Sequence, residues 1–349
     1  MVDEEHLELL KQGVSAWNHW RNQHQHIQPN LSQAFLQAVD LREAILSHVN
    51  LKGGVLSYAD FCMADLTQAD LSSATLQAAL FYTTNLDQAN LCGADLRGAD
   101  LREASLQGAN LQQANLQQAS LCMTNLRDTN LREANLQEAN LSFAALSHAD
   151  ACLTDFTKAN LTQVDLKATQ LYTATFSQAT LYAANLSQAD VREAIFSQAN
   201  LREANLREAD LSMAVFCLAN LVGATLYKAN LWRANLSMAN LCMADLSHAN
   251  LSYAILIGTN LIGANLYIAQ FERAVLKEAD LREASLGKAN LIEADLRKAN
   301  LSRANLSGAN LSGANLSGAN LHQANLWEAN LEGVCLTGAT LPSGTVYRP

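Results

Sequence analysis

A five-residue period constrains this chain more than any other feature, because it runs from residue 31 to residue 341 without an insertion or a deletion. If the leucine position is called i, stepping by five from Leu31 gives 63 positions, of which 54 are Leu and seven are Phe. The two others are Ala151 and Val191. The residue at i−2 is small, mostly Ala, and the residue at i−1 is Asn or Asp in most units. A fixed period of this kind predicts a solenoid.

The period of five fits neither an amphipathic helix, which needs about 3.6 residues, nor a plain strand, which needs 2. Within one unit, i−2 and i are alternate strand positions and share the inner side, whereas i−1 points outward. The two residues after i then turn a corner. We expect Asn and Asp to suit this corner because they tolerate bridge and left-handed backbone angles.

The spacing of the phenylalanines predicts how many units close one coil. Four of them recur at steps of 20 residues between Phe156 and Phe216, and another two lie 20 residues apart. This favours coils of four units whose rings stack in the interior. Two undersized residues precede a Phe by one unit, as close packing demands. The predicted interior includes Phe61, Phe81, Ala151, Phe156, Phe176, Val191, Phe196, Phe216 and Phe271.

The tandem pattern A-(D/N)-L-x-x resembles the pentapeptide-repeat family over roughly nine-tenths of the chain. The resemblance implies an all-β fold, a right-handed quadrilateral parallel β-helix, here with four pentapeptides per coil and about 16 coils at the strand spacing of a sheet. We therefore expect an N-terminal helical cap and linker at residues 1–29, a β-helix at 30–341 and a C-terminal tail at 342–349.

Residues 3–22 have the apolar spacing of a single amphipathic helix, with Asp3 as its N-cap. We expect this helix to act as a lid over the first coil, which would otherwise expose strand edges; docking of a partner is the alternative. The histidines between His19 and His26 have no recognised metal-ligand spacing and are typical of a polar linker.

The rest of the composition narrows the class of protein. No run of 18 apolar residues exists, so no transmembrane helix is expected, and the acidic N-terminus lacks the pattern of a secretory signal. The seven cysteines contain no Cys-x-x-Cys, and Cys62 and Cys122 share a face but lie three coils apart, beyond disulfide distance. Free thiols and a cytoplasmic location are the preferred interpretation.

No catalytic, cofactor or metal site is predicted. His48, His148 and His248 fall on one face but five coils apart, which prevents joint action. An uninterrupted solenoid also offers no concave pocket of the kind that enzymes use. The seven Arg-Glu pairs, such as Arg282 and Glu283, are interpreted as weak surface pairs along the stack.

DNA mimicry is the alternative function, because some pentapeptide-repeat proteins resemble duplex DNA and bind DNA gyrase. Residues 31–341 carry 29 acidic and 20 basic side chains, spread over all four faces. Duplex DNA of the same length would carry on the order of 40 negative charges. Gyrase-binding relatives also carry loops that interrupt the coils, and this chain has none. Direct nucleic-acid binding is not expected either, because the net charge is negative and no basic patch appears.

A protein-binding scaffold is the preferred prediction, with a partner that the sequence does not name and with a homodimer through one end of the solenoid as an open possibility. The face that contains Phe61 and Phe81 has twelve apolar corner residues, against five, eight and seven on the others. Isolated apolar residues are also normal on any surface. The candidate strip comprises Cys62, Met63, Tyr82, Cys122, Met123, Phe143, Tyr182, Ala183, Val222, Cys242, Met243 and Ile262.

Overall fold

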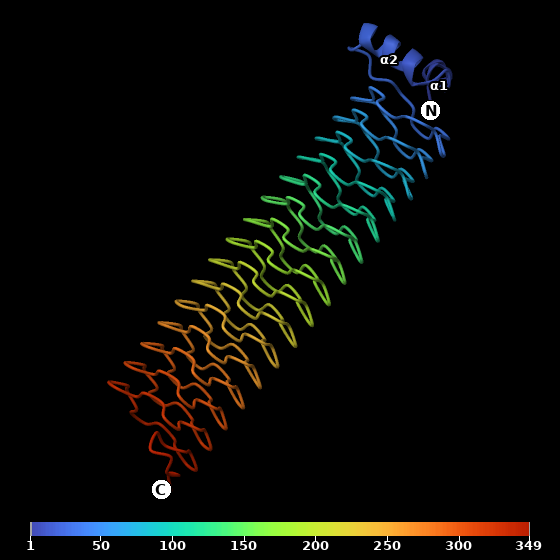
Figure 1. Cartoon of the computed structure of the whole chain (residues 1–349). Coiled ribbons are helices and arrows are strands. Elements are labelled where there is room, and N and C mark those ends of the chain that lie inside the picture. The colour runs from blue at the N-terminus through green and yellow to red at the C-terminus, as the bar shows by residue number, and fades with distance from the viewer. Residues whose placement is uncertain (1, 349) are drawn as a thin grey trace. The chain divides into compact units, whose positions relative to one another are not determined.

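The computed structural model describes residues 2–348, and the chain divides into two compact units, residues 1–175 (unit 1) and 176–349 (unit 2). Each unit is a parallel β-solenoid whose bridge residues occupy the i−1 positions. Every parallel bridge joins a residue to the one 20 positions later, as between Asn30 and Asn50 in unit 1 and between Thr180 and Asn200 in unit 2. Figure 1 shows the successive coils of each unit and two helices at the N-terminal end, α1 (Glu4–Lys11) and α2 (Val14–Gln23).

The backbone N–H groups of one pentapeptide repeat, residues 261–265, show why the repeat is stable. The N–H groups of Leu261 and Gly263 donate to carbonyls of the following coil, at 2.7 and 2.9 Å, and that of Asn265 donates to the preceding coil at 2.9 Å. The Ala264 N–H closes a turn onto the Leu261 carbonyl at 3.0 Å. The fifth N–H, that of Ile262, donates to the Asn260 side chain at 3.1 Å. All five donors are thus bonded.

The left-handed backbone falls on the residue at i+2, which corrects the role expected for Asn and Asp. Nearly every i+2 residue has φ between about 52° and 72°, including the β-branched Thr83 and Ile268. Asn and Asp at i−1 are instead the bridge residues of the coils. Their side-chain oxygen accepts a hydrogen bond from the backbone N–H two residues later, as in an Asx turn. Their conserved chemical task in the repeat is acceptance of a hydrogen bond, because the corner torsion is made elsewhere.

The interior is formed by the i and i−2 side chains, as predicted. Phe61 and Phe81 stack at 4.9 Å in unit 1, and in unit 2 Phe196 stacks on Phe176 at 4.7 Å and on Phe216 at 4.8 Å. The remaining predicted interior residues are fully buried as well: Ala151, Phe156, Val191 and Phe271. Buried threonines at i−2 donate to interior carbonyls, as Thr259 does to Leu236 at 2.8 Å. The interior therefore leaves these hydroxyls paired.

The N-terminal segment forms two helices where the sequence predicted one. Gly13, at φ +104°, separates α1 from α2, and this torsion cannot occur inside a helix. Asp3 does cap α1, because its side chain accepts from the N–H groups of Glu5 and His6. The single-helix prediction failed because the apolar spacing continues across the break.

Helix α2 covers the open edge of the first coil with polar side chains. The Trp17 indole donates to the Ile45 carbonyl at 2.8 Å, and Arg21 donates to the Ser47 carbonyl at 3.1 Å. The Asn18 oxygen accepts from the Ile45 N–H at 2.8 Å. These contacts replace the hydrogen bonds that a preceding coil would supply, which is what a lid over the first coil must do.

The C-terminal end of unit 2 has a much smaller cover. Residues 342–348 turn back so that Val346 bridges Thr340 in the antiparallel sense and the Tyr347 N–H donates to Ala339. Ala339 is buried, but Leu331, an interior position, is 39% exposed. The last coil therefore keeps part of its interior open.

Candidate interaction surface

An apolar surface in unit 2 stands out from the polar exterior of the repeat. Residues 211–271 contain three charged residues, Lys228, Arg233 and Asp245, in a chain that is 16% charged. On the face whose interior holds Phe196 and Phe216, four of the five outward i−1 positions between residues 195 and 275 are apolar where Asn or Asp is usual, and the fifth is Asn235. We call this surface the apolar face; it consists of Ile195, Val215, Leu218, Met238, Ile255, Ile257 and Val275.

Two methionines at neighbouring corners lie over glycines of the next coil. The Met238 sulfur lies 2.6 Å from the position that a Cβ of Gly258 would take, and the Met243 sulfur has the same relation to Gly263. These side chains are nevertheless 60% and 67% exposed. Flexible, polarisable methionines on an open surface are typical of binding sites that adapt to their partner.

In the part of the chain that the structure describes, the apolar face also carries four open backbone donors, those of Ser197, Lys277 and, at its centre, Cys217 and Ile257. Ile255 and Val215 stand at i−1 and have no side-chain oxygen, so the N–H groups of Ile257 and Cys217 lack the usual acceptor. Within residues 2–348 neither N–H has a hydrogen-bond partner. A partner that offers carbonyl oxygens could bond to both while covering the apolar side chains.

The structure places the predicted strip residues on the outside but divides them. In unit 1, Met63, Tyr82, Met123 and Phe143 are exposed, and in unit 2 Met243 is. The other strip residues are partly buried, all at the first corner position except Ala183, which is at the second: Cys62, Cys122, Tyr182, Ala183, Val222, Cys242 and Ile262.

Arg102 interrupts the strip in unit 1. Its guanidinium lies 5.8 Å from the Tyr82 ring and pairs with Asp100. In unit 2, by contrast, Val222, Cys242, Met243 and Ile262 occupy three successive coils with no charged corner residue between them. They continue around the corner into the apolar face.

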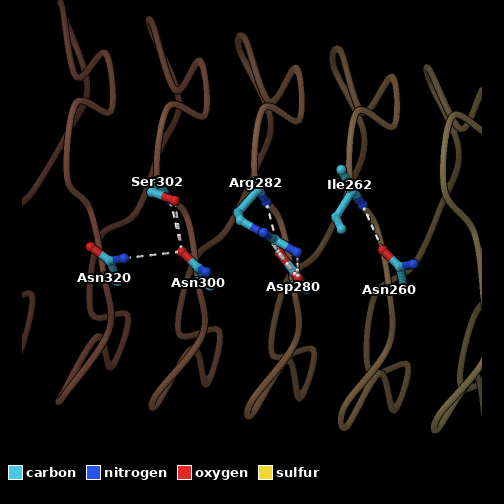
Figure 2. Close-up of polar contacts among 7 residues, drawn as sticks. All are labelled: Asn260, Ile262, Asp280, Arg282, Asn300, Ser302 and Asn320. Carbon is cyan, nitrogen blue, oxygen red and sulfur yellow. Dashed lines mark hydrogen bonds and ion pairs between the residues drawn. The ribbon is translucent and has the colours of Figure 1, made fainter.

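Four of the seven arginines of the Arg-Glu pairs bond to an Asp of their own pentapeptide, whereas Arg207 pairs with its neighbour Glu208. Where Asp stands at i−1, the Arg at i+1 pairs with it in two-pronged fashion, as Arg282 does with Asp280 at 2.7 Å (Figure 2). Figure 2 also shows the alternative at Asn300, whose oxygen accepts from Ser302 and from the Asn320 amide. The Asp carboxylate thus pairs with the Arg two residues later because both side chains point outward at the same place in the coil.

These clamps affect the ionisation of the carboxylates. The hydrogen bond from Arg97 lowers the pKa of Asp95 to about 2, and that from Arg42 lowers the pKa of Asp40 to about 2. Six pentapeptide repeats have this Asp-x-Arg arrangement: 40–42, 95–97, 100–102, 190–192, 280–282 and 295–297. In each of these repeats the arginine compensates the negative charge of the Asp, which makes the electrostatic potential of the surface less negative.

Several kinds of site have no counterpart in the described part of the chain. Among residues 2–348, no group of three His, Cys, Asp or Glu side chains is placed to hold a metal ion. His248 lies beside Tyr227 and Tyr267 and not beside another histidine. No helix in residues 2–348 is long and apolar enough to cross a membrane.

Sequence reasoning missed Leu218, Met238 and Ile257 because it compared whole faces, and over its full length their face has fewer apolar corner residues than the face of the predicted strip. The sequence did contain a usable signal. Between Asp210 and Glu272 the charge density falls sharply, and Val or Ile replaces Asn or Asp at i−1 on one face. Counting charged residues in a window moved along the sequence would have located the apolar face.

Comparisons with known proteins agree with this architecture. The family model for pentapeptide repeats (8 copies) matches ten segments between residues 27 and 341. The crystal structure of HetL, a pentapeptide repeat protein involved in heterocyst differentiation regulation from the cyanobacterium Nostoc sp. strain PCC 7120, is 36% identical. The match has a TM-score of 0.52 and covers 64% of this chain and 92% of HetL.

Two further matches are less extensive. Rfr23, a pentapeptide repeat protein from the cyanobacterium Cyanothece 51142, is 40% identical over 34% of this chain and 63% of its own, with a TM-score of 0.22. QnrB1, a plasmid-mediated fluoroquinolone resistance protein, is 21% identical over 52% of this chain and 86% of its own, with a TM-score of 0.24. No curated protein matches the sequence. The chain is a right-handed β-helical solenoid with two N-terminal helices and belongs to the pentapeptide-repeat family.

Proposed function

We propose that this protein is a non-enzymatic scaffold that binds a protein partner through the apolar face of unit 2. The observation that carries the proposal is the uncharged surface over three coils, which includes Met238 and Ile257 and is continuous with Met243 and Ile262. Exposed apolar surface with methionines at its centre is a feature of binding sites. HetL, the relative with which the fold is shared, is involved in regulation.

The open donors of Cys217 and Ile257 support a protein partner in particular. Covering an apolar surface with a chain that has peptide carbonyls would satisfy these two N–H groups at the same time. The flexible methionines would adjust to the shape of the partner at little cost, because their sulfurs already lie on glycines and not against rigid side chains.

The test is affinity capture from a native lysate with the wild-type protein and with the triple variant Met238→Ser, Met243→Ser, Ile257→Ser. We expect one or more proteins that bind the wild type and are lost from the variant, and a melting temperature that changes little because all three side chains are on the outside. A control replaces three exposed glutamines at the corner position that Met238 and Met243 also occupy: Gln113→Ser, Gln118→Ser and Gln178→Ser. Equal capture by all three proteins would refute the proposal.

DNA mimicry makes a different prediction. If the purified protein inhibited DNA gyrase supercoiling, and the triple variant did so equally, the function would reside in the acidic side chains and not in the apolar face. The charge compensation in the Asp-Arg clamps argues against this outcome, because it leaves fewer free carboxylates on the surface.

A homodimer, if one forms, is proposed to use the C-terminal end. There the N–H groups of Leu326, Leu331 and Leu336 have no partner within residues 2–348, and Leu331 is exposed. The N-terminal end is covered by α2 through Trp17. Sedimentation analysis of the wild type and of Leu331→Lys would show a concentration-dependent dimer that the variant lacks; a monomer at all concentrations would refute the dimer.

The same proposal includes a regular quadrilateral β-helix with four pentapeptides per coil, about 16 coils and a cytoplasmic location. The 20-residue step of the bridges supports the coil size. The seven unpaired thiols support a reducing compartment.

A further inference from the structure

A column of aromatic and basic side chains lies on another face of unit 2, one that the proposed function does not use. Its members stand at the corners of successive coils. The Tyr227 and His248 rings are 5.5 Å apart, and the His248 and Tyr267 rings are 6.2 Å apart, in both cases edge to face. The Arg207 guanidinium lies 4.6 Å from the Tyr227 ring and the Lys228 ammonium 5.3 Å from it.

Tyr267 is open to a ligand, whereas Tyr227 is half-buried. Tyr267 is 38% exposed, and its ring lies beside Gly287, where a Cβ would come within 3.2 Å of it. The glycine thus leaves room for the ring against the surface. Neither the Tyr227 nor the Tyr267 hydroxyl has a hydrogen-bond partner within residues 2–348. Tyr267 therefore offers an exposed ring and an unused donor, and Tyr227 offers an unused donor and the outer edge of a ring that two cations flank.

The spacing of the column identifies the ligand conformation that fits it. One coil of unit 2 advances by 4.7–4.8 Å, so the backbone positions of Tyr227 and Tyr267, two coils apart, are about 9.5 Å apart along the stack. A polyproline II helix repeats every three residues, or about 9.3 Å. An α-helix repeats at about 5.4 Å and a strand at about 6.6–6.8 Å per residue pair, and neither matches one or two coils.

We propose that Tyr227, His248 and Tyr267 form a binding site for a proline-rich peptide in the polyproline II conformation. Two prolines three residues apart would each pack on one tyrosine, with His248 beneath the residues between them. The backbone carbonyls of such a peptide have no internal hydrogen bonds and would accept from the tyrosine hydroxyls.

The charges near Tyr227 add a requirement for the sequence of the peptide. Arg207 and Lys228 flank this ring; Arg207 is paired with Glu208 at 3.2 Å, an acid that also accepts from Gln188, whereas Lys228 makes no ion pair within residues 2–348. Asp245, in the middle coil with His248, accepts from Ser247 and Asn265. The site therefore favours a peptide with acidic residues at the end that lies on Tyr227.

The experiment is fluorescence anisotropy of the full-length protein with a fluorescein-labelled decaproline that ends in two glutamates. We expect saturable binding that weakens with salt, weaker binding of decaproline without the glutamates, and none of a Gly-Ser peptide with the same glutamates. Tyr267→Ala and Tyr227→Ala should each weaken binding by about tenfold or more, as loss of a central aromatic contact does. The Phe variants of both should weaken it less.

Tyr253→Ala is the matched control, because Tyr253 is also a 38% exposed tyrosine of unit 2 but lies on a different face, next to Arg273. It should bind the peptide as the wild type does. Equal binding of the proline and Gly-Ser peptides, no saturable binding, or the same loss in Tyr253→Ala would each overturn the proposal. None of these outcomes bears on the apolar face, since the capture experiment uses different variants.

Discussion

Replacing Phe196 by Ala tests whether the stacked rings stabilise unit 2 beyond their burial. Phe196 is fully buried and stacks on two rings, at 4.7 and 4.8 Å with interplanar angles of 0° and 2°. Phe271 is equally buried, but within residues 2–348 no aromatic ring stacks on it. Each Phe→Ala change should cost about 3–5 kcal/mol through lost burial and the cavity left behind.

The loss of two aromatic pairs adds about 1–3 kcal/mol in Phe196→Ala only. We therefore expect Phe196→Ala to be more destabilising than Phe271→Ala by that difference. Phe196→Leu introduces the residue that is usual at this position, so its loss in free energy of unfolding should be smaller than that of either alanine variant. Urea unfolding followed by circular dichroism gives the free energies of unfolding. Because solenoids can unfold in parts, hydrogen exchange of segments around residues 196 and 271 should be measured as well. Equal losses in the two alanine variants would refute a contribution of ring stacking.

Four further changes test other features of the fold. Ala151→Leu should destabilise unit 1 by about 1–3 kcal/mol in urea unfolding, because the interior around this small residue is already filled; a stabilised variant would contradict the predicted volume compensation. Ile268→Gly should raise the free energy of unfolding by about 1 kcal/mol, because Ile268 is held at φ 59°, whereas an unchanged or lower value would show that unfolded-state entropy dominates. Thr259→Val should lower it by about 0.5–1.5 kcal/mol through loss of the hydrogen bond to Leu236, and no change would mean that this bond contributes nothing net. Because Arg97 lowers the pKa of Asp95 from 3.8 to about 2, this pair stabilises the fold above pH 4 and the contribution is lost as the pH falls toward 2; urea unfolding at several pH values should show a shallower acid dependence in Asp95→Asn, and an identical dependence would exclude a role for the clamp.

The sequence by itself determined the solenoid, its interior and much of its register. Every pentapeptide has apolar residues at the same two positions, i and i−2, so the side that faces the interior follows from the local sequence alone. The 20-residue spacing of the phenylalanines also predicted which rings meet: Phe61 stacks on Phe81, and Phe176, Phe196 and Phe216 stack in unit 2. A periodic chain turns long-range contacts into a fixed sequence offset, and this made them predictable.

The tertiary structure decided what depends on side-chain direction and on the ends of the solenoid. Sequence alone did not show that Gly13 divides the N-terminal helix, or that Asp280 clamps its own Arg282. Nor did it place the Met238 sulfur over Gly258 or His248 between two tyrosines. The outward positions tolerate almost any residue, so the repeat does not constrain their contacts. Those contacts depend on side-chain rotamers, either within one pentapeptide, as between Asp280 and Arg282, or between neighbouring coils, as between His248 and the two tyrosines.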